Sequence, residues 1–347
     1  MKFYDITQEP IKIYGLSVVD GKERKFWRLP GEMMEKMPGL DYLGKRCTGG
    51  RVRFCTDAAE FVIRMTLKEA AEDINFPTAG SAGADVYFGR GTESVYGGYI
   101  APWNHSQEEI TIEKTFFKPA GMENVTINLP RSDHLLGMEI GLPEDAVLAP
   151  PEEYTLQAPI IYYGSSITEG GCVSRVGCAY TSILSRWLDA DYRNYGFSGC
   201  AKGEEEFARF LAEHKEISAF VYDYDHNTPS IDHLQATHEK FFEIFRKAHP
   251  GVPVLMLSRP DVDPYTDDIQ QLRDIVCRTY QNARAKGDKN VYFIDGRQYF
   301  GDLGRAECTI DGVHPTALGM MRMAETIYPV LRKMCYPAKS AEISPFC

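Results

Sequence analysis

The sequence predicts two domains of different class, an all-β domain in residues 1–150 and an α/β domain with a parallel sheet in residues 151–347. Three observations support this prediction. The spacing of apolar residues changes part-way along the chain, Pro150 and Pro151 stand where it changes, and 347 residues suffice for two domains of ordinary size.

Strand-like segments fill the first half of the chain. Apolar and polar residues alternate in short runs at 12–19, 51–56, 61–67, 84–89, 124–129 and 136–142, and turn-forming residues separate these runs. Alternation with a period of two is typical of strands that bury one face in a sandwich or barrel. We therefore expect a β-sandwich of the jelly-roll kind before residue 150.

The second half alternates strands with helices. Uniformly apolar segments at 158–164, 192–199, 218–225, 252–258 and 290–296 are separated or followed by helix-like segments at 204–214, 232–249, 267–286 and 317–334. Strands that are apolar throughout indicate a parallel sheet with both faces covered. We predict a doubly wound α/β domain with five strands.

Composition excludes several classes of function. The net charge of -11 disfavours nucleic acid, which binds proteins through lysine and arginine. No apolar run reaches the roughly 18 residues of a membrane span, and the N-terminus lacks a secretory signal. The nine cysteines contain no CxxC pair, and the acid-rich segment 261–268 lacks the glycine and glutamate of an EF-hand. We expect a cytoplasmic protein without a metal or cofactor.

The residues that follow the predicted strands are suited to acyl transfer. Ligands of a doubly wound sheet bind at the carboxyl ends of its strands, and Ser166 follows the first strand. A serine hydroxyl becomes a nucleophile when a histidine accepts its proton and a carboxylate orients that histidine. Asp311 and His314, three residues apart before the last helix, can supply both groups. The three residues form a predicted catalytic triad.

An oxyanion hole can be placed at the same edge. The N–H groups of Ser166 and Gly199 and the side-chain amide of Asn227 come from three neighbouring strand ends. Each such donor is typically worth about 3 kcal/mol in the transition state.

Four segments resemble a known family in order and spacing. "GSSIT", "NYGFSG", "VYDYDHN" and "DGVHP" are similar to the four sequence blocks of the SGNH hydrolases, also called GDSL lipases and esterases. The resemblance covers about residues 158–334. It implies a flavodoxin-like sheet, Ser166 as nucleophile, Gly199 and Asn227 in the oxyanion hole, and Asp311 with His314 as the remaining catalytic pair.

A second resemblance lies in the first half, and the blocks also show departures. "SAGADVYFG" is similar to the GxDLY signature of an N-terminal β-domain found before some of these hydrolases, with Gly83, Asp85 and Tyr87 at its fixed positions. The family's acidic residue before the nucleophile is Ser165 here, which we expect to be structural. "DHNT" replaces the usual "GxND" of the third block. We expect an altered pocket rather than lost catalysis.

Each candidate also has an ordinary structural interpretation. Ser166 could only cap the helix that follows it, Asn227 could form an Asx-turn, and Gly199 could be a loop glycine. Asp223 and Asp225 could pair as acid and base or bind a metal, but hydrogen bonds to neighbouring loops are the simpler interpretation.

Three further residues are candidates for substrate binding. Arg259 follows the fourth strand and could anchor a polar group or form a salt bridge between loops. His226 could line the pocket or face solvent. Trp103, with His105, could reach over the active site and stack on a sugar ring, or it could be buried at the domain interface.

We therefore expect a serine esterase that removes a short acyl group, particularly acetyl, from a sugar or other small hydroxylated molecule. The acyl and sugar preference is implied by the resemblance. The expected partner is a small-molecule or oligosaccharide ester, and assembly into a homo-oligomer is left open. One alternative is a glycan-binding protein with an inactive hydrolase-like domain. Another is a flavodoxin-like nucleotide or receiver domain, but no GxGxxG or GxxxxGK[ST] loop follows the first strand.

Overall fold

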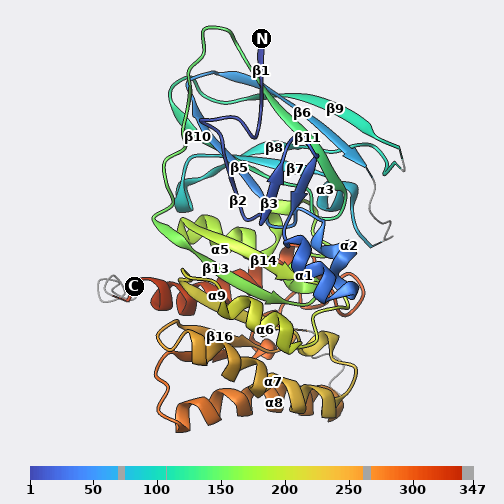
Figure 1. Ribbon diagram of the computed structural model, residues 1–347, viewed down its shortest axis with the longest axis vertical. Coiled ribbons are helices and arrows are strands. Elements are labelled where there is room, and N and C mark those ends of the chain that lie inside the picture. The colour runs from blue at the N-terminus through green and yellow to red at the C-terminus, as the bar shows by residue number, and fades with distance from the viewer. Residues whose placement is uncertain (69–74, 107, 261–266, 338–347) are drawn as a thin grey trace. The chain divides into compact units, whose positions relative to one another are not determined.

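The computed structural model describes residues 1–68, 75–106, 108–260 and 267–337 (Figure 1). Most of the acid-rich segment considered for calcium, residues 261–266, lies outside the described residues. The chain forms two compact units. Unit 1 comprises Met1–Gln157 and Glu169–Asn194, and unit 2 comprises Ala158–Thr168 and Tyr195–Cys347.

Unit 1 is built on two antiparallel sheets. The first has the order β1 (Lys2–Asp5), β11 (His134–Leu142), β6 (Glu60–Lys68), β9 (Ile110–Phe117). The second has the order β12 (Leu148–Ala149), β5 (Arg51–Thr56), β10 (Glu123–Asn128), β7 (Ala84–Phe88), β8 (Val95–Ile100), and β2 (Lys12–Tyr14) also pairs with β5. A separate hairpin joins β3 (Val18–Asp20) to β4 (Lys25–Trp27).

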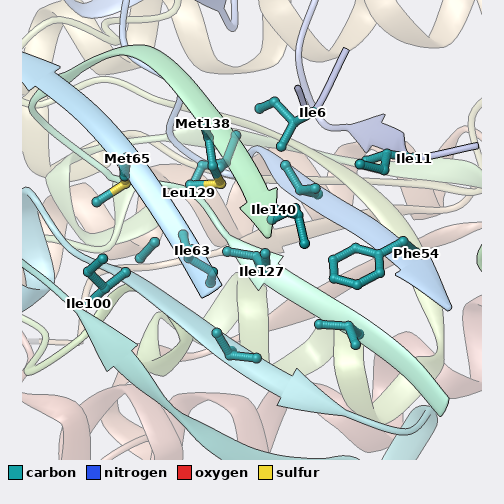
Figure 2. Close-up of a cluster of buried hydrophobic side chains, with 14 of the residues drawn as sticks. Ile6, Ile11, Phe54, Ile63, Met65, Ile100, Ile127, Leu129, Met138 and Ile140 are labelled. Carbon is teal, nitrogen blue, oxygen red and sulfur yellow. The ribbon is translucent and has the colours of Figure 1, made fainter. Parts of the chain in front are cut away.

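The two sheets of unit 1 share one hydrophobic core. Alternate residues of β6, including Ile63 and Met65, are buried in the same cluster as Phe54 and Ile127 of the other sheet (Figure 2). Arg64, which lies between Ile63 and Met65, points to the outer face and pairs with Glu113 of β9 and Glu139 of β11. The alternation in the sequence thus reflects a β-sandwich, as predicted.

Short helices connect and cover these strands. They are α1 (Gly31–Lys36), α2 (Asp41–Gly44), α3 (Thr78–Ser81) and α5 (Tyr180–Leu188). Asp85 of the GxDLY-like signature is fully buried and ties β7 to the segment before α5. Its carboxylate accepts hydrogen bonds from the Arg175 guanidinium at 2.8 Å, the Gly177 N–H at 3.0 Å and the Asn128 amide at 2.8 Å. The aspartate of the signature is therefore a buried tether within unit 1.

A five-stranded sheet forms the α/β part of the chain. Its order is β14 (Ala190–Gly196), β13 (Leu156–Gly164), β15 (Ala219–Asp223), β16 (Val254–Leu257), β17 (Val291–Ile294). The pairs β13–β15, β15–β16 and β16–β17 are parallel. In chain order the arrangement is 2-1-3-4-5, which is the flavodoxin-like order. The predicted fold class is confirmed.

Helices alternate with these strands in unit 2. They are α6 (Glu205–Ala212), α7 (Ile231–Ala248), α8 (Asp267–Ala285) and α9 (Ala317–Cys335), and α7 and α8 lie side by side in Figure 1. The side chain of Ser230 caps α7 by accepting a hydrogen bond from the His233 N–H. Within the described residues, no helix combines the length and apolar character that crossing a membrane requires.

Candidate active site

The turn after β13 places Ser166 at the carboxyl edge of the sheet. β13 ends at Gly164, and the short helix α4 (Ser166–Glu169) starts two residues later. Gly164 allows a close approach of the neighbouring strand, because a Cβ there would lie 1.8 Å from a carboxylate oxygen of Asp223. Ser165 is buried, and its hydroxyl accepts a hydrogen bond from the Ile167 N–H at 3.2 Å. Ser165 is thus the capping residue, which leaves the Ser166 hydroxyl for another partner.

That partner is His314, which lies 148 residues later in the sequence, in the loop before α9. The hydroxyl oxygen of Ser166 lies 2.8 Å from His314 Nε2, and His314 Nδ1 lies 2.8 Å from Asp311 Oδ2. Ser166 is 8% exposed, whereas the side chains of His314 and Asp311 are more open to solvent. The structure therefore joins all three predicted catalytic residues in one hydrogen-bonded line.

The loop that carries Asp311 and His314 is closed by its own backbone. The N–H of Ile310 donates to the carbonyl of His314 at 3.0 Å, and Asp311 Oδ1 accepts the N–H groups of Val313 and His314 at 3.0 and 2.7 Å. Thr316 then caps α9 by accepting a hydrogen bond from the Gly319 N–H. The turn before the last helix is thus fixed on both sides.

The charge of Asp311 suits its position beside the imidazole. Partial burial acts to raise the pKa of its carboxyl, but the hydrogen bonds from His314 and Val313 outweigh burial and lower the pKa below the ordinary value. Asp311 is therefore a carboxylate at neutral pH. It can hold His314 in the tautomer whose Nε2 accepts a proton, and it can stabilise the imidazolium that results.

The predicted oxyanion-hole residues belong to loops that hydrogen bonds connect. The Phe197 N–H donates to the carbonyl of Gly164 at 2.8 Å, and the Phe197 carbonyl accepts the Asn227 side-chain amide at 2.9 Å. Gly199 follows two residues later with a φ of +68°, a left-handed conformation that favours glycine. The hydrogen bonds of the Phe197 backbone thereby link the loops after β13, β14 and β15.

Two aspartates of the third block bond to neighbouring loops. Asp223, the last residue of β15, accepts the Ser165 N–H at 3.4 Å and the Thr168 hydroxyl. Asp225 begins the short 3-10 helix Asp225–Asn227 and accepts the Arg259 N–H at 2.9 Å. These contacts agree with the structural interpretation of the pair. Asp223 holds the turn of Ser166, a role that the sequence indicated only through its position at a strand end.

The three substrate-binding candidates come from three different segments of the chain. His226 is partly buried in the middle of the 3-10 helix, next to Asn227, and Arg259 is partly buried beyond β16. Trp103 belongs to unit 1, and its side chain is 98% exposed. Trp103 is therefore not packed within unit 1, and its placement at the domain interface stays a prediction.

Sequence analysis missed the last residue of α4, Glu169, which is fully buried in unit 1. Its carboxylate lies 2.8 Å from Arg28 Nη2, 3.4 Å from Arg46 Nη1 and 3.6 Å from Arg131 Nη1. All three guanidiniums are also buried. The available signal was a single acidic residue, Glu169, in the otherwise uncharged stretch "GSSITEGG". A carboxylate that is buried there requires a cationic partner.

Comparison with known proteins identifies the family. Residues 157–332 match the GDSL-like lipase/acylhydrolase family, and residues 1–148 match GxDLY, the N-terminus of SGNH-hydrolase-type esterases. The chain belongs to the GDSL-like lipase/acylhydrolase family. The resemblance found in the sequence is therefore confirmed for both halves. No curated protein matches the sequence.

Several solved structures are similar along nearly the whole chain. A GDSL-like lipase from Bacteroides ovatus has 26% identity and a TM-score of 0.83, and the match covers 96% of this chain and 97% of the other. The salicylyl-acyltransferase SsfX3 from a tetracycline biosynthetic pathway has 20% identity and a TM-score of 0.76, with 94% and 95% covered. The acetyl xylan esterase Est2A from Butyrivibrio proteoclasticus has 12% identity and a TM-score of 0.57, with 96% and 98% covered. The last two share the fold.

Family membership makes the chain a hydrolase of the esterase kind.

Proposed function

We propose that this protein is a serine esterase that hydrolyses a carboxylic ester through an acyl-enzyme, with Ser166 as nucleophile. One observation carries the proposal. Ser166 Oγ lies 2.8 Å from His314 Nε2, while the opposite ring nitrogen of His314 lies 2.8 Å from the carboxylate of Asp311. This is the geometry in which a histidine can accept the serine proton while a carboxylate fixes its tautomer.

The reaction follows from these positions. Ser166 Oγ attacks the ester carbonyl as His314 takes the hydroxyl proton, and His314 returns that proton to the leaving alcohol when the carbon–oxygen bond of the ester breaks. Water then attacks the acyl-enzyme, again giving a proton to His314, and the acid is released as the proton returns to Ser166. Asp311 stays ionised throughout, in agreement with its lowered pKa.

The oxyanion would be held by the Ser166 N–H, the Gly199 N–H and the Asn227 amide. An asparagine amide has two N–H donors, and Asn227 uses one for the Phe197 carbonyl. That bond orients the amide and leaves the second N–H for the developing charge. Donors that are fixed before the reaction stabilise the transition state without reorganisation.

We propose a short acyl group, particularly acetyl, on a sugar or oligosaccharide as the substrate. The solved structures that share this fold include an acetyl xylan esterase, which supports the choice at the level of fold. A salicylyl-acyltransferase shares the fold too. An alcohol that attacks the acyl-enzyme in place of water is therefore a second candidate acceptor.

The nucleophile can be tested with two adjacent serines. Wild-type protein is expected to cleave p-nitrophenyl acetate and to be labelled by a fluorophosphonate probe at Ser166, with the site read by mass spectrometry. Ser166→Ala should lose the label and at least a thousandfold in kcat, on the order of the loss seen when a catalytic triad is broken. Ser165→Ala, which removes a cap rather than the nucleophile, should keep the label.

Two results would contradict the proposal. Labelling at Ser165, or equal turnover by Ser166→Ala, would reassign the nucleophile. Wild-type protein that neither cleaves the ester nor takes the label would favour the alternative of a glycan-binding protein with an inactive hydrolase-like domain.

A further inference from the structure

Unit 1 contains a groove at the edges of its two sheets. β8 is the edge strand of one sheet and β9 is the edge strand of the other, and the connection between them begins at Ala101. The groove has a volume of about 790 Å³ and its lining includes Tyr99, Trp103, Asn104, His105, Glu113 and Lys114. This volume lies in the range of about 300 to 1,000 Å³ that is usual for small-molecule sites.

The aromatic side chains of this groove face solvent. Trp103 is 98% exposed and Tyr99 is 45% exposed. Exposed apolar side chains that lie together, rather than singly, mark surfaces with a binding role, and Trp103 and Tyr99 line the same groove. The ring of Trp103 gives the groove a flat apolar face.

Two side chains of the groove lining, Lys114 and His105, make polar contacts within the protein. Lys114 Nζ donates to the Tyr99 carbonyl at 2.7 Å and lies 5.0 Å from the centre of the Tyr99 ring. His105 Nδ1 lies 3.0 Å from Asp133 Oδ1, and His105 Nε2 lies 3.2 Å from Ser81 Oγ. Groups that are fixed before binding lose less conformational entropy when a ligand arrives. The His105 ring of the groove is therefore preorganised.

The contacts of His105 repeat the order serine, histidine, aspartate, but they do not form a second nucleophilic site. Ser81 is 1% exposed, so a substrate cannot reach its hydroxyl. Its Oγ also lies 3.1 Å from the carbonyl of Pro77, to which the hydroxyl can donate. We therefore assign Ser81 and Asp133 to holding the His105 ring.

We propose that this groove binds a segment of a neutral polysaccharide. A sugar ring has an apolar face that stacks on an aromatic ring and a rim of hydroxyls that bond to polar groups. Trp103 and Tyr99 offer the rings, and the Asn104 amide and the Lys114 ammonium offer polar groups. Groups of the protein already engage both charges of the lining, because Glu113 lies 2.9 Å from Arg64 Nε and Lys114 Nζ donates to the Tyr99 carbonyl at 2.7 Å, and this favours a neutral chain. The site goes beyond the proposed esterase and does not require Ser166.

The test measures binding in the absence of turnover. Full-length protein with Ser166→Ala is titrated by calorimetry with three unsubstituted ligands, xylohexaose, cellohexaose and mannohexaose. We expect at least one to bind, and we expect Trp103→Ala in the same background to weaken that binding on the order of tenfold or more. Phe117→Ala is the matched control, because Phe117 is a 68% exposed aromatic residue of β9 outside the groove lining.

The outcomes separate this inference from the proposed esterase. Failure of all three ligands to bind, or equal affinities for the Trp103→Ala and Phe117→Ala proteins, would overturn the groove as a polysaccharide site. Cleavage of p-nitrophenyl acetate by the wild type is scored separately. An inactive protein that still binds through Trp103 would refute the esterase and leave the groove supported.

Discussion

Replacing Glu169 by glutamine should destabilise unit 1 strongly. The change keeps the shape of the side chain but removes the carboxylate that Arg28, Arg46 and Arg131 all contact. Burial lowers the pKa of Arg28 to about 10, although the nearby Glu169 carboxylate acts to raise it. A positive charge is therefore unfavourable at this position even with Glu169 present. Breaking a buried ion pair by removing one partner typically costs about 3 to 5 kcal/mol, and we expect a loss in that range.

The loss can be measured in unit 1 specifically. The three tryptophans of the chain, Trp27, Trp103 and Trp187, all lie in unit 1, so tryptophan fluorescence during urea unfolding reports on that unit. Glu113→Gln is the control, because Glu113 pairs with Arg64 at 2.9 Å but is half exposed. An exposed pair of this kind contributes about 0 to 1 kcal/mol. A loss for Glu169→Gln no larger than that of the control would refute the reasoning.

Three further predictions concern catalysis and pH. Asp311→Asn should lower kcat for p-nitrophenyl acetate by roughly 10³ to 10⁴ with little change in KM, because His314 would lose the carboxylate that sets its tautomer; a loss below tenfold would contradict this. Gly164→Ala should lower kcat about a hundredfold, because its Cβ would displace Asp223 and with it the nucleophile turn; unchanged kinetics would exclude that contact. Burial lowers the pKa of His238 to about 3 in the folded protein, whereas an unfolded histidine has a pKa near 6.5. Between these two pH values the unfolded chain carries a proton on His238 that the folded protein does not. Stability should therefore fall as pH drops below about 6.5, by about 2 kcal/mol at pH 5 from this group, and His238→Phe should remove that part of the fall in urea unfolding curves at pH 7 and 5.

The elements that the sequence predicted well are those with one clear pattern. The segment expected as a helix at 232–249 is α7, Ile231–Ala248, and the strand expected at 252–258 contains β16, Val254–Leu257. The helix α5 was not predicted, because it is buried on most sides and carries threonine and serine among its buried residues. α5 also has only 9 residues, whereas α7 has 18, so its periodic pattern covers few turns.

Several strands of unit 1 were missed, and β8 and β9 show the opposite reason. β8 contains two consecutive glycines and exposes most of its side chains, and β9 exposes most of its residues as well. Both are edge strands, where the buried face that produces alternation is incomplete. Their exposure is also the condition for the proposed groove, so two strands that were not predicted line it.

The candidate triad could be predicted because each residue lies in a short block with its own local pattern. Ser166 follows an apolar strand, and Asp311 and His314 stand in a turn before a helix. The partners of Glu169 and Asp85 could not be predicted in this way. Arg28 lies 141 residues from Glu169, and Arg175 lies 90 residues from Asp85. Only the folded chain brings these charges together, and the domain boundary expected at residue 150 stays a prediction.

Ser165 lies beside the carboxylate of Asp223, at the end of β15, the strand that pairs with β13. A carboxylate at 165, as the family's blocks have it, would stand in a buried turn whose N–H already lies 3.4 Å from Asp223. Two like charges so close in a buried site repel each other unless one is neutralised. Serine avoids the second charge and still accepts the Ile167 N–H. Asp223 then supplies the negative charge from β15, where it also binds Thr168. The departure from the family's pattern therefore removes a charge from the turn and keeps the hydrogen bonds that hold Ser166.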